Sequence, residues 1–454
     1  MPIEKSDLDA LRQRLQGELL AAGDPGWEEA RFGWNVGYDP RPELIALPRG
    51  AEDVAAIVRF AAGTGLRVAP QNTAHNPGPL GPLEGAILVR TAGMDSVEVD
   101  SASRTARVGA GARWGDLVPQ ASELGLAALH GSSPTVGIVG YSLGGGLGWY
   151  ARKHGLACNR VTGLEVVTAD GERRRVDRES EPDLFWALRG GGGSYAFVTA
   201  IEFELLELPQ LHAGALFFPF ERGAEVLHAW HEWSATVPEE MTSIGRLLRF
   251  PPLEQIPEPV RGKSFAIVET VFIGSEAEGA ELTAPLAALG PVMNSLAAVP
   301  PAGISGLHMD PPGPIKGMTG HSMLELSPEA IDVVVETAGS PVGAALNGVE
   351  LRHCGGALSR EAEGCGALPN LPGTHLMSAV TATMEPAEVE PAEAAQAALA
   401  AAIEPHTAGR TLNFCSGATP FEDCLPAATC ERLRATKAGY DPEGRFQANH
   451  ELDR

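Results

Sequence analysis

The chain has 454 residues, of which 44% are hydrophobic and 20% charged, and its formal net charge is -24. This length exceeds the usual size of a single compact core, so we expect two domains or one domain with a large insert. The acidic balance disfavours nucleic acid and anionic membranes as partners. No stretch approaches the ~20 apolar residues of a membrane span and the N-terminus is charged, so we expect a cytoplasmic protein, with monomer and homodimer both open.

The first domain is expected over residues 1–206, where short apolar runs alternate with turn signals. Residues 51–64 are predicted to form a helix, because Val54, Ile57, Val58 and Ala61 recur at helical spacing. Strands are predicted at 66–69, 86–91, 96–100 and 105–109, with a hairpin of 163–169 and 172–176 around Asp170-Gly171. This pattern indicates an α+β unit.

A second, substrate-side domain is expected over residues 207–406, where longer strands alternate with amphipathic helices. The strands are predicted at 211–220, 265–273, 349–353 and 376–383, and the helices at 223–236, 328–337 and 392–403. The Pro-rich stretch Pro300–Pro314 is expected to be a surface loop over or near this sheet. Residues 407–454 form a third segment, with a strand at 411–415 and a helix at 430–438.

Six cysteines occur without the CxxC pairing of a zinc site or the spacing of a disulfide framework. We interpret them as free, buried thiols and predict no metal site. They are Cys158, Cys354, Cys365, Cys415, Cys424 and Cys430.

Three segments have the small residues that let a backbone approach a bulky ligand. The first, Pro70–Gly78, follows a predicted strand, and consecutive N–H groups in such a turn form a cradle for a pyrophosphate. His75 ends this loop; taken alone, a histidine here is more often a hydrogen-bonded loop residue. The second, Gly131–Gly148, has seven glycines in eighteen positions. The third runs from Asp183 through the turn Gly190–Gly193 to Thr199.

A Rossmann dinucleotide site is the obvious competitor for the second segment. It is disfavoured because the glycines do not follow a predicted strand with GxGxxG spacing, and no acidic residue closes a βαβ unit at the expected distance.

Together the three segments resemble the FAD-binding domain of the vanillyl-alcohol oxidase and p-cresol methylhydroxylase (PCMH) flavoproteins, in their berberine-bridge-enzyme-like branch. Tyr440-Asp441-Pro442, Phe446 and Asn449 resemble the C-terminal signature of that branch, and Leu351–Ala357 resembles a strand that ends in GGA. The resemblance covers residues 40–206 and 405–454. It implies a two-domain α+β fold, with a PCMH-type FAD-binding domain and a substrate domain built on a mixed or antiparallel sheet covered by helices.

The resemblance also implies FAD contacts. His75 falls where the family carries an 8α-histidyl link to the flavin, and Ser133 replaces the cysteine that forms a second, 6-S-cysteinyl link in bicovalent members, so a single link is expected. Gln71, Asn72, Thr73 and Ala74 would form the pyrophosphate loop, and Gly137, Gly140, Tyr141, Gly144 and Gly145 would line the pyrophosphate and ribityl chain. Val198 would meet the adenine side and Asn413 would lie beside the isoalloxazine ring. Thr135 and Val136 complete the cofactor-binding set.

The implied function is FAD-dependent hydride removal from a carbon that bears OH or NH on a small organic substrate, such as a secondary metabolite or sugar, with molecular oxygen as acceptor. The family's tyrosine at the start of the YxNF strand is Thr411 here, and threonine is a poor base. Tyr141 and Glu350 are the candidate catalytic bases, and the remaining candidates are Tyr150, Arg352 and His353. Alternatives are a redox-neutral cyclisation or isomerisation and a non-catalytic flavin-binding protein.

Strand alternation bears on these candidates. It places Glu350 and Arg352 on one face of the strand and His353 on the other, so only one set faces the flavin. The other interpretation of Glu350 and Arg352 is a same-face or surface ion pair.

Overall fold

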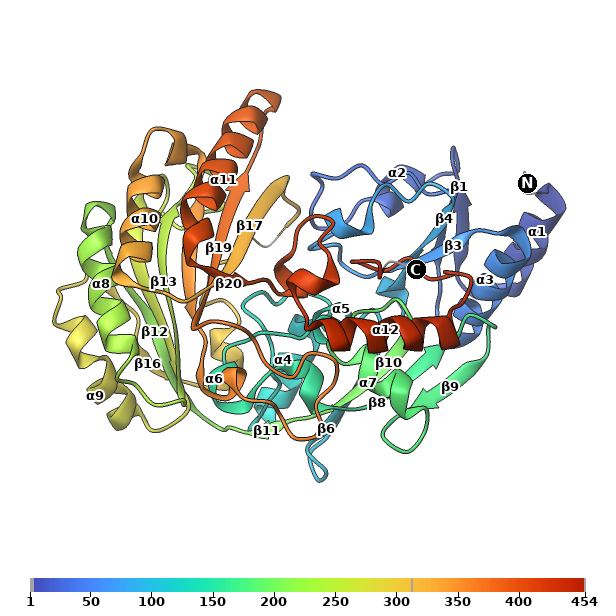
Figure 1. Cartoon of the computed structure of the whole chain (residues 1–454), viewed down its shortest axis with the longest axis horizontal. Coiled ribbons are helices and arrows are strands. Elements are labelled where there is room, and N and C mark those ends of the chain that lie inside the picture. Colours follow the sequence, from blue (N-terminus) through green and yellow to red (C-terminus); the bar gives the residue numbers. More distant parts are fainter. Residues whose placement is uncertain (1–3, 312, 453–454) are drawn as a thin grey trace.

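The computed structural model describes residues 4–311 and 313–452, which form an elongated α+β molecule with the N-terminal half at one end and a large helix-covered sheet at the other (Figure 1). The α+β fold class predicted from the sequence is confirmed. The helices are α1 (Lys5–Arg14), α2 (Trp27–Arg31), α3 (Ala51–Thr64), α4 (Trp114–Glu123), α5 (Ile138–Leu143), α6 (Ala151–His154), α7 (Pro182–Leu188), α8 (Gly223–Ser234), α9 (Glu276–Ala287), α10 (Pro328–Gly339), α11 (Val389–Ile403) and α12 (Ala427–Tyr440).

The N-terminal sheet has four strands, in the order β1 (Glu18–Ala21), β2 (Leu44–Leu47), β4 (Ala86–Arg90) and β3 (Arg67–Gln71). Strand β4 pairs in parallel with β2 and β3, and β1 pairs antiparallel with β2. Helix α3 has the predicted bounds because its apolar stripe is fully buried and Gly65 ends it with a φ of 77°. Strand β3 then leads directly into the loop that carries His75.

A second sheet has five antiparallel strands, in the order β5 (Val97–Asp100), β6 (Thr105–Gly109), β10 (Phe197–Glu204), β8 (Val161–Val167) and β9 (Arg173–Val176). The predicted hairpin at Asp170-Gly171 is present, with Val167 paired to Arg173 and Gly171 at a φ of 77°. Strands β7 (Leu126–Ala127) and β11 (Leu206–Glu207) form a short separate pair. One hydrophobic core spans the four-stranded N-terminal sheet and this five-stranded sheet.

The third sheet is the largest, and its strand pairs are antiparallel. Helices α8, α9, α10 and α11 cover one face, as Figure 1 shows, and the Val226, Leu227 and Trp230 stripe of α8 lies in that core, as predicted. The strands follow the order β15 (Met293–Asn294), β12 (Leu211–Pro219), β14 (Ser264–Phe272), β13 (Met241–Arg249), β18 (Gly348–His353), β19 (His375–Ala382), β17 (Gly317–Leu324) and β20 (Thr407–Gly409), with β16 (Ala297–Val299) also on β12.

The opposite face of this sheet meets the N-terminal half. Leu211, Ile244 and Val271 pack there against Leu129 and Trp149. This buried junction brings the glycine-rich segment Gly131–Gly148 against the large sheet.

One local prediction is incomplete and another is wrong. Pro300–Pro314 is not simply a surface loop: it begins with a 3₁₀ turn, Pro301–Ile304, and it buries Ile304 and His308 over the sheet. The predicted strand at 411–415 is instead a 3₁₀ turn, Leu412–Phe414. The amides of Phe414 and Cys415 donate to carbonyls three residues earlier, so a local turn satisfies the backbone where a strand would need a neighbouring strand.

The chain crosses back to the N-terminal half after β20. Helix α12 packs on α7, and the final segment reaches β3, where Val68 donates to the Arg445 carbonyl and Gln447 donates to the Val68 carbonyl. The tail therefore extends the edge of the sheet that delivers the His75 loop.

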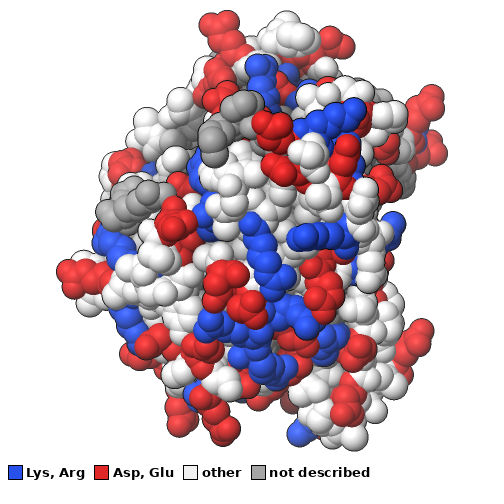
Figure 2. Space-filling model, turned by 90° about the vertical axis from the view of Figure 1, so that its right-hand side faces the viewer, with Lys and Arg blue, Asp and Glu red and all other residues white. Residues whose placement is uncertain are grey.

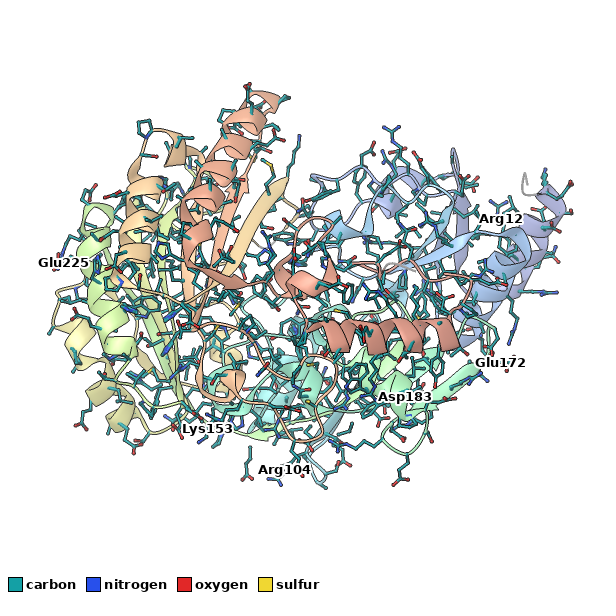
Figure 3. The ribbon with its side chains drawn as sticks, in the orientation of Figure 1. Arg12, Arg104, Lys153, Glu172, Asp183 and Glu225 are labelled. Carbon is teal, nitrogen blue, oxygen red and sulfur yellow. The ribbon has the colours of Figure 1, made fainter. Side chains whose placement is uncertain are left out.

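Charged side chains lie mainly on the outside. In Figure 3 the labelled Arg12, Arg104, Glu172 and Glu225 lie near the outline of the molecule. On the end of the molecule seen in Figure 2 the Lys and Arg side chains are interleaved with Asp and Glu. Within residues 4–311 and 313–452, none of the helices combines the length and the apolar character that crossing a membrane requires.

Candidate functional site

The His75 side chain is held by two contacts at the end of the loop that follows β3. Its ring stacks on Trp34, with centroids 4.1 Å apart and an interplanar angle of 15°, and its Nε2 lies 2.9 Å from Oγ1 of Thr135. That hydroxyl lies 2.9 Å from Oγ of Ser133. Burial lowers the pKa of His75 to about 4, so the imidazole is neutral at pH 7. Two residues predicted to flank the flavin are thus linked to His75 by hydrogen bonds.

The glycine-rich segment Gly131–Gly148, called the glycine turn below, packs directly against the His75 loop and the tail. A Cβ at Gly137 would lie 2.6 Å from Nδ2 of Asn72, and a Cβ at Gly144 would lie 1.8 Å from Oδ1 of Asn413. Gly140 differs, because a Cβ there would meet no heavy atom within 4 Å. Gly137 and Gly144 are therefore required for close packing, whereas Gly140 borders open space.

The third glycine segment is joined to the end of the second. The amides of Gly190 and Gly192 both donate to the Leu143 carbonyl, at 3.0 Å each. Val198 follows in β10, where it is buried and pairs with Val166.

Asn413 joins the tail to the glycine turn. Its Nδ2 donates to the Tyr141 carbonyl at 2.8 Å. The Tyr141 hydroxyl in turn donates to the Leu129 carbonyl at 3.1 Å, and its ring meets Trp114 edge-on. Burial raises the pKa of Tyr141 far above its ordinary value. This phenol therefore keeps its proton at neutral pH.

The C-terminal tail also makes two hydrogen bonds to the His75 loop. Asn76, the residue after His75, donates from Nδ2 to the Cys415 carbonyl at 2.7 Å, and Nδ2 of Asn449 donates to the Asn76 carbonyl at 2.7 Å. The C-terminal signature residue Asn449 thus holds the His75 loop itself.

The residues around the glycine turn fit a dinucleotide with a polar ring system. Three buried polar atoms beside the turn have no hydrogen-bond partner among the described residues: Nε2 of His130, Nε1 of Trp149 and the hydroxyl of Tyr150. The Ser194 hydroxyl of the third segment is likewise unpartnered there. Buried polar groups are ordinarily satisfied, so these donors and acceptors, together with the open space at Gly140, suit a polar ligand.

Two cavities border these segments. One of about 300 Å³ lies against the His75 loop at Gln71, Ala74 and Gly78, and is also lined by Asn35 and Arg31. A second, of about 10 Å³, lies where Ser132 of the glycine turn and the adjacent Trp149 meet Arg352 of the large sheet. The smaller cavity marks the junction between the two halves.

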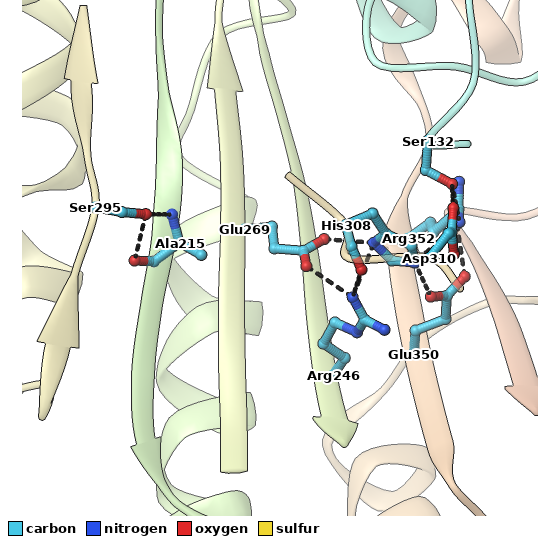
Figure 4. A network of polar contacts seen from close by, with 9 residues as sticks. All are labelled: Ser132, Ala215, Arg246, Glu269, Ser295, His308, Asp310, Glu350 and Arg352. Carbon is cyan, nitrogen blue, oxygen red and sulfur yellow. Dashed lines mark hydrogen bonds and ion pairs between the residues drawn. The ribbon is translucent and has the colours of Figure 1, made fainter. Parts of the chain in front are cut away.

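A buried network of charged residues lies at this junction (Figure 4). Arg352 donates from Nε to Oε1 of Glu350 at 2.7 Å, and the other oxygen of Glu350 lies 2.8 Å from Nε2 of His308. The second ring nitrogen of His308 lies 2.6 Å from Glu269, which also pairs with Arg246 at 2.7 Å. Three strands and the Pro-rich segment therefore contribute to one continuous set of ion pairs.

The network reaches the glycine turn through Ser132. The Ser132 hydroxyl donates to Oδ2 of Asp310 at 3.1 Å, and Nη2 of Arg352 lies 3.4 Å from the same hydroxyl (Figure 4). Ser132 precedes Ser133, which is linked to His75 through Thr135. Two successive serines, Ser132 and Ser133, therefore connect the charged network and His75 to adjacent positions of the same segment.

The pKa shifts in the network all favour charge. Burial acts to raise the pKa of Glu350, but Arg352 and His308 outweigh it and hold that pKa well below its usual range. Burial and Arg246 act to lower the pKa of His308, but Glu269 and Glu350 outweigh them and raise it to about 9. Burial acts to raise the pKa of Glu269, but His308 and Arg246 outweigh it and lower that pKa. Both carboxylates and the imidazolium are therefore charged at pH 7.

The predicted alternation along β18 is confirmed. Glu350 and Arg352 share the face with the ion pairs, whereas His353 lies on the opposite face, 2.7 Å from Nη1 of Arg152 and stacked on His375. Burial and Arg152 lower the pKa of His353 to about 2. The ion pair expected as the alternative for Glu350 and Arg352 is present, but it is buried rather than on the surface.

Trp34, His308, Glu269 and Arg246 were not identified from the sequence. Trp34 lies in an irregular segment, and His308 is a single histidine in a Pro-rich stretch. Only the pairing of β13 with β14 and β18 brings Arg246 and Glu269 to the same face as Glu350.

Comparison with known proteins agrees with this arrangement. Residues 42–177 match the FAD binding domain family. Over 196 residues, 43% of each chain, the protein is 38% identical to (R)-6-hydroxynicotine oxidase of Paenarthrobacter nicotinovorans. It is 36% identical over 211 residues, 46% of this chain and 42% of the relative, to glucooligosaccharide oxidase of Sarocladium strictum. These matches span less than half the length of either relative.

Solved structures match over nearly the whole chain. The crystal structure of 6-hydroxy-D-nicotine oxidase from Arthrobacter nicotinovorans aligns with a TM-score of 0.83 at 26% identity, over 97% of this chain and 98% of that one. The BBE-like 1 protein of Physcomitrella patens aligns with a TM-score of 0.83 at 18% identity, over 98% and 99%, and shares the fold. Fold and matched domain define an FAD-binding flavoprotein. Residues 42–177 match the FAD binding domain family, and the whole chain is similar to berberine-bridge-enzyme-like flavoproteins with a PCMH-type FAD-binding domain.

Proposed function

We propose that the protein is an FAD-dependent oxidase that takes a hydride from a carbon bearing OH or NH in a small organic substrate. One observation carries this proposal: segments far apart in sequence meet around the loop that presents His75. Gly137 packs on Asn72 of that loop, and the Cys415 carbonyl of the tail accepts a hydrogen bond from Asn76. Gly192 of the third segment donates to Leu143, next to Gly144. The names of the two curated relatives describe oxidases, one of 6-hydroxynicotine and one of glucooligosaccharides.

Separate residues of this chain would hold different parts of FAD. FAD, when bound, supplies a hydride acceptor and passes electrons on to molecular oxygen. His75 would hold it by a single 8α-histidyl link, because Ser133 offers no thiol for a second one. Backbone N–H groups of residues 71–74 and of the glycine turn would bind the pyrophosphate.

Proton removal from the substrate requires a base on the same side as the cofactor. The contacts favour Glu350 over Tyr141, because Glu350 is ionised and free of protons whereas the Tyr141 hydroxyl donates its proton to the Leu129 carbonyl. The strong pairing of Glu350 makes it a weak base, so it would act only when bound substrate displaces Arg352 or His308 from its oxygens.

The covalent link is tested by denaturing the purified, flavin-loaded protein in acid. The yellow colour should stay with the pellet, and the labelled peptide should contain His75. The variant H75A should release all its flavin into the supernatant, whereas H228A, on the exposed face of α8, should retain it. A colourless wild-type pellet would refute the link while leaving FAD binding intact.

A redox-neutral cyclisation or isomerisation is the second candidate, and the buried Thr411 favours it, since it stands where relatives carry a tyrosine. Anaerobic mixing with candidate alcohols and amines separates the two. Bleaching of the flavin absorbance supports hydride transfer, and product without bleaching supports the redox-neutral reaction. The absence of both bleaching and product supports a non-catalytic flavin-binding protein.

A further inference from the structure

Two cysteines of the tail lie in contact at the ends of two successive 3₁₀ turns. Sγ of Cys415 is 3.8 Å from Sγ of Cys424 and 3.4 Å from Nε2 of His321, which projects from β17. Both cysteines are free thiols. A thiol in contact with both a second thiol and an imidazole resembles the surroundings of reactive cysteines more than those of inert ones.

The surroundings distinguish Cys415 from the other cysteines. The hydrogen bond from Cys424 lowers the pKa of Cys415, and His321 lowers it further, against the effect of burial. The same hydrogen bond, with burial, raises the pKa of Cys424. Burial also raises the pKa of the four remaining thiols, which are Cys158, Cys354, Cys365 and Cys430. Cys415 is therefore the thiol that most readily forms a thiolate.

The pair lies just under the surface and directly behind the His75 loop. Cys415 is 1% exposed and Cys424 9%. The residues between them form an irregular segment with one short turn, Phe421–Asp423, and several of them are exposed. Such a segment opens locally at low cost, which admits a small molecule. The Cys415 carbonyl binds Asn76, so the pair adjoins the proposed cofactor link.

We propose that Cys415 and Cys424 are a thiol oxidation site that hydrogen peroxide converts to a disulfide. The Cys415 proton moves to Nε2 of His321, and the thiolate attacks one peroxide oxygen to give a sulfenic acid while the other oxygen leaves as hydroxide and takes the proton from His321 to form water. The Cys424 sulfur then attacks the Cys415 sulfur and displaces hydroxide, which takes the Cys424 proton. Two thiols are oxidised and one peroxide is reduced to two waters.

The sulfurs must approach from 3.8 Å to about 2.05 Å to form this bond. The intervening segment is irregular apart from the turn Phe421–Asp423, so rotation of the two cysteine side chains and a local shift of this segment provide the approach. Peroxide is the product that the proposed oxidase would release beside this pair. The test uses added peroxide and therefore does not depend on the proposed activity.

The experiment treats purified protein with one to ten equivalents of hydrogen peroxide, alkylates the remaining thiols and maps peptides without reduction. Trypsin should release 411–432, which holds Cys415, Cys424 and Cys430, lighter by two hydrogens. Cleavage after Glu422 separates Cys415 from the other two, so a remaining cross-link shows that Cys415 takes part, and fragment masses that place the alkyl group on Cys430 identify Cys424 as its partner. The matched control is Cys365, which is more exposed but has a raised pKa, and it should react at least about tenfold more slowly.

Variants separate the two steps. C424S should stop at a sulfenic acid on Cys415 that a 1,3-dione probe traps, C415S should form no cross-link, and C430S should behave as wild type. H321Q should slow the first step by at least about tenfold. Oxidation of Cys365 before Cys415, or six alkylated thiols after treatment of the wild type, would overturn the proposal without reference to any variant.

Discussion

Different interactions position the residues on the two sides of the junction: close backbone packing on one side and buried ion pairs on the other. On the FAD-domain side, the glycine turn is positioned by backbone contacts and by the absence of side chains, as at Gly137 and Gly144. On the large-sheet side, Glu350, His308 and Glu269 are positioned by charge in a buried network. The first side tolerates no added atoms at Gly137 and Gly144, and the second tolerates no lost charge. Substitutions should therefore fail for opposite reasons on the two sides.

The largest effect is expected from removal of the proposed base. E350Q should lower turnover of a substrate, once one is identified, by about 10²–10⁴-fold, because a neutral amide cannot take a proton. H353Q is the matched control, since His353 lies on the same strand but on its other face. Steady-state kinetics per flavin-loaded enzyme measure both. Equal losses in the two variants would place the base elsewhere.

A lost charge should cost stability even away from the reacting atoms. E269Q leaves Arg246 and His308 buried without their carboxylate, and we expect the free energy of unfolding to fall by about 3–5 kcal/mol. E225Q removes a carboxylate from the ion pair with Arg222 at the outer surface of α8 (Figure 3) and should leave the denaturation midpoint unchanged. Similar denaturation midpoints for E269Q and E225Q would contradict the view that the large-sheet side of the junction depends on its buried charges.

The charged side should also respond to pH. The pKa of His308 is raised from 6.5 to about 9, so its stabilising charge is fully present below pH 6.5 and is lost as the pH rises through 9. Wild type should lose on the order of 3 kcal/mol relative to H308N between pH 6.5 and 10. Denaturant titrations at several pH values measure this difference. Parallel pH profiles would show that His308 is not an imidazolium in the folded protein.

The smallest expected effect lies on the glycine side. In G144A the new methyl group would overlap Asn413, and we expect a loss of about 1–3 kcal/mol in the free energy of unfolding. In G140A the methyl group enters open space, so stability should be unchanged, but flavin content should fall if Gly140 lines the cofactor. Thermal unfolding and flavin absorbance per protein distinguish these outcomes. Equal destabilisation would contradict the different packing of the two glycines.

Sequence patterns located most of the regular elements because their causes are local. The buried stripe of α3, the alternation along β18 and the turn at Asp170-Gly171 each depend on residues a few positions apart. The strand expected at 411–415 failed for the complementary reason: its residues have β character, but no neighbouring strand pairs with them.

The sequence by itself determined the glycine-rich side. A segment that must let a ligand approach its backbone excludes side chains, so it contains several glycines close together in the sequence, where they can be recognised. Only the tertiary structure decided the charged side. Arg246, Glu269, His308 and Glu350 have no common spacing, and a charge becomes a partner only when strands and a loop distant in sequence bury it beside its opposite. The pairing of Cys415 with His321 has the same origin.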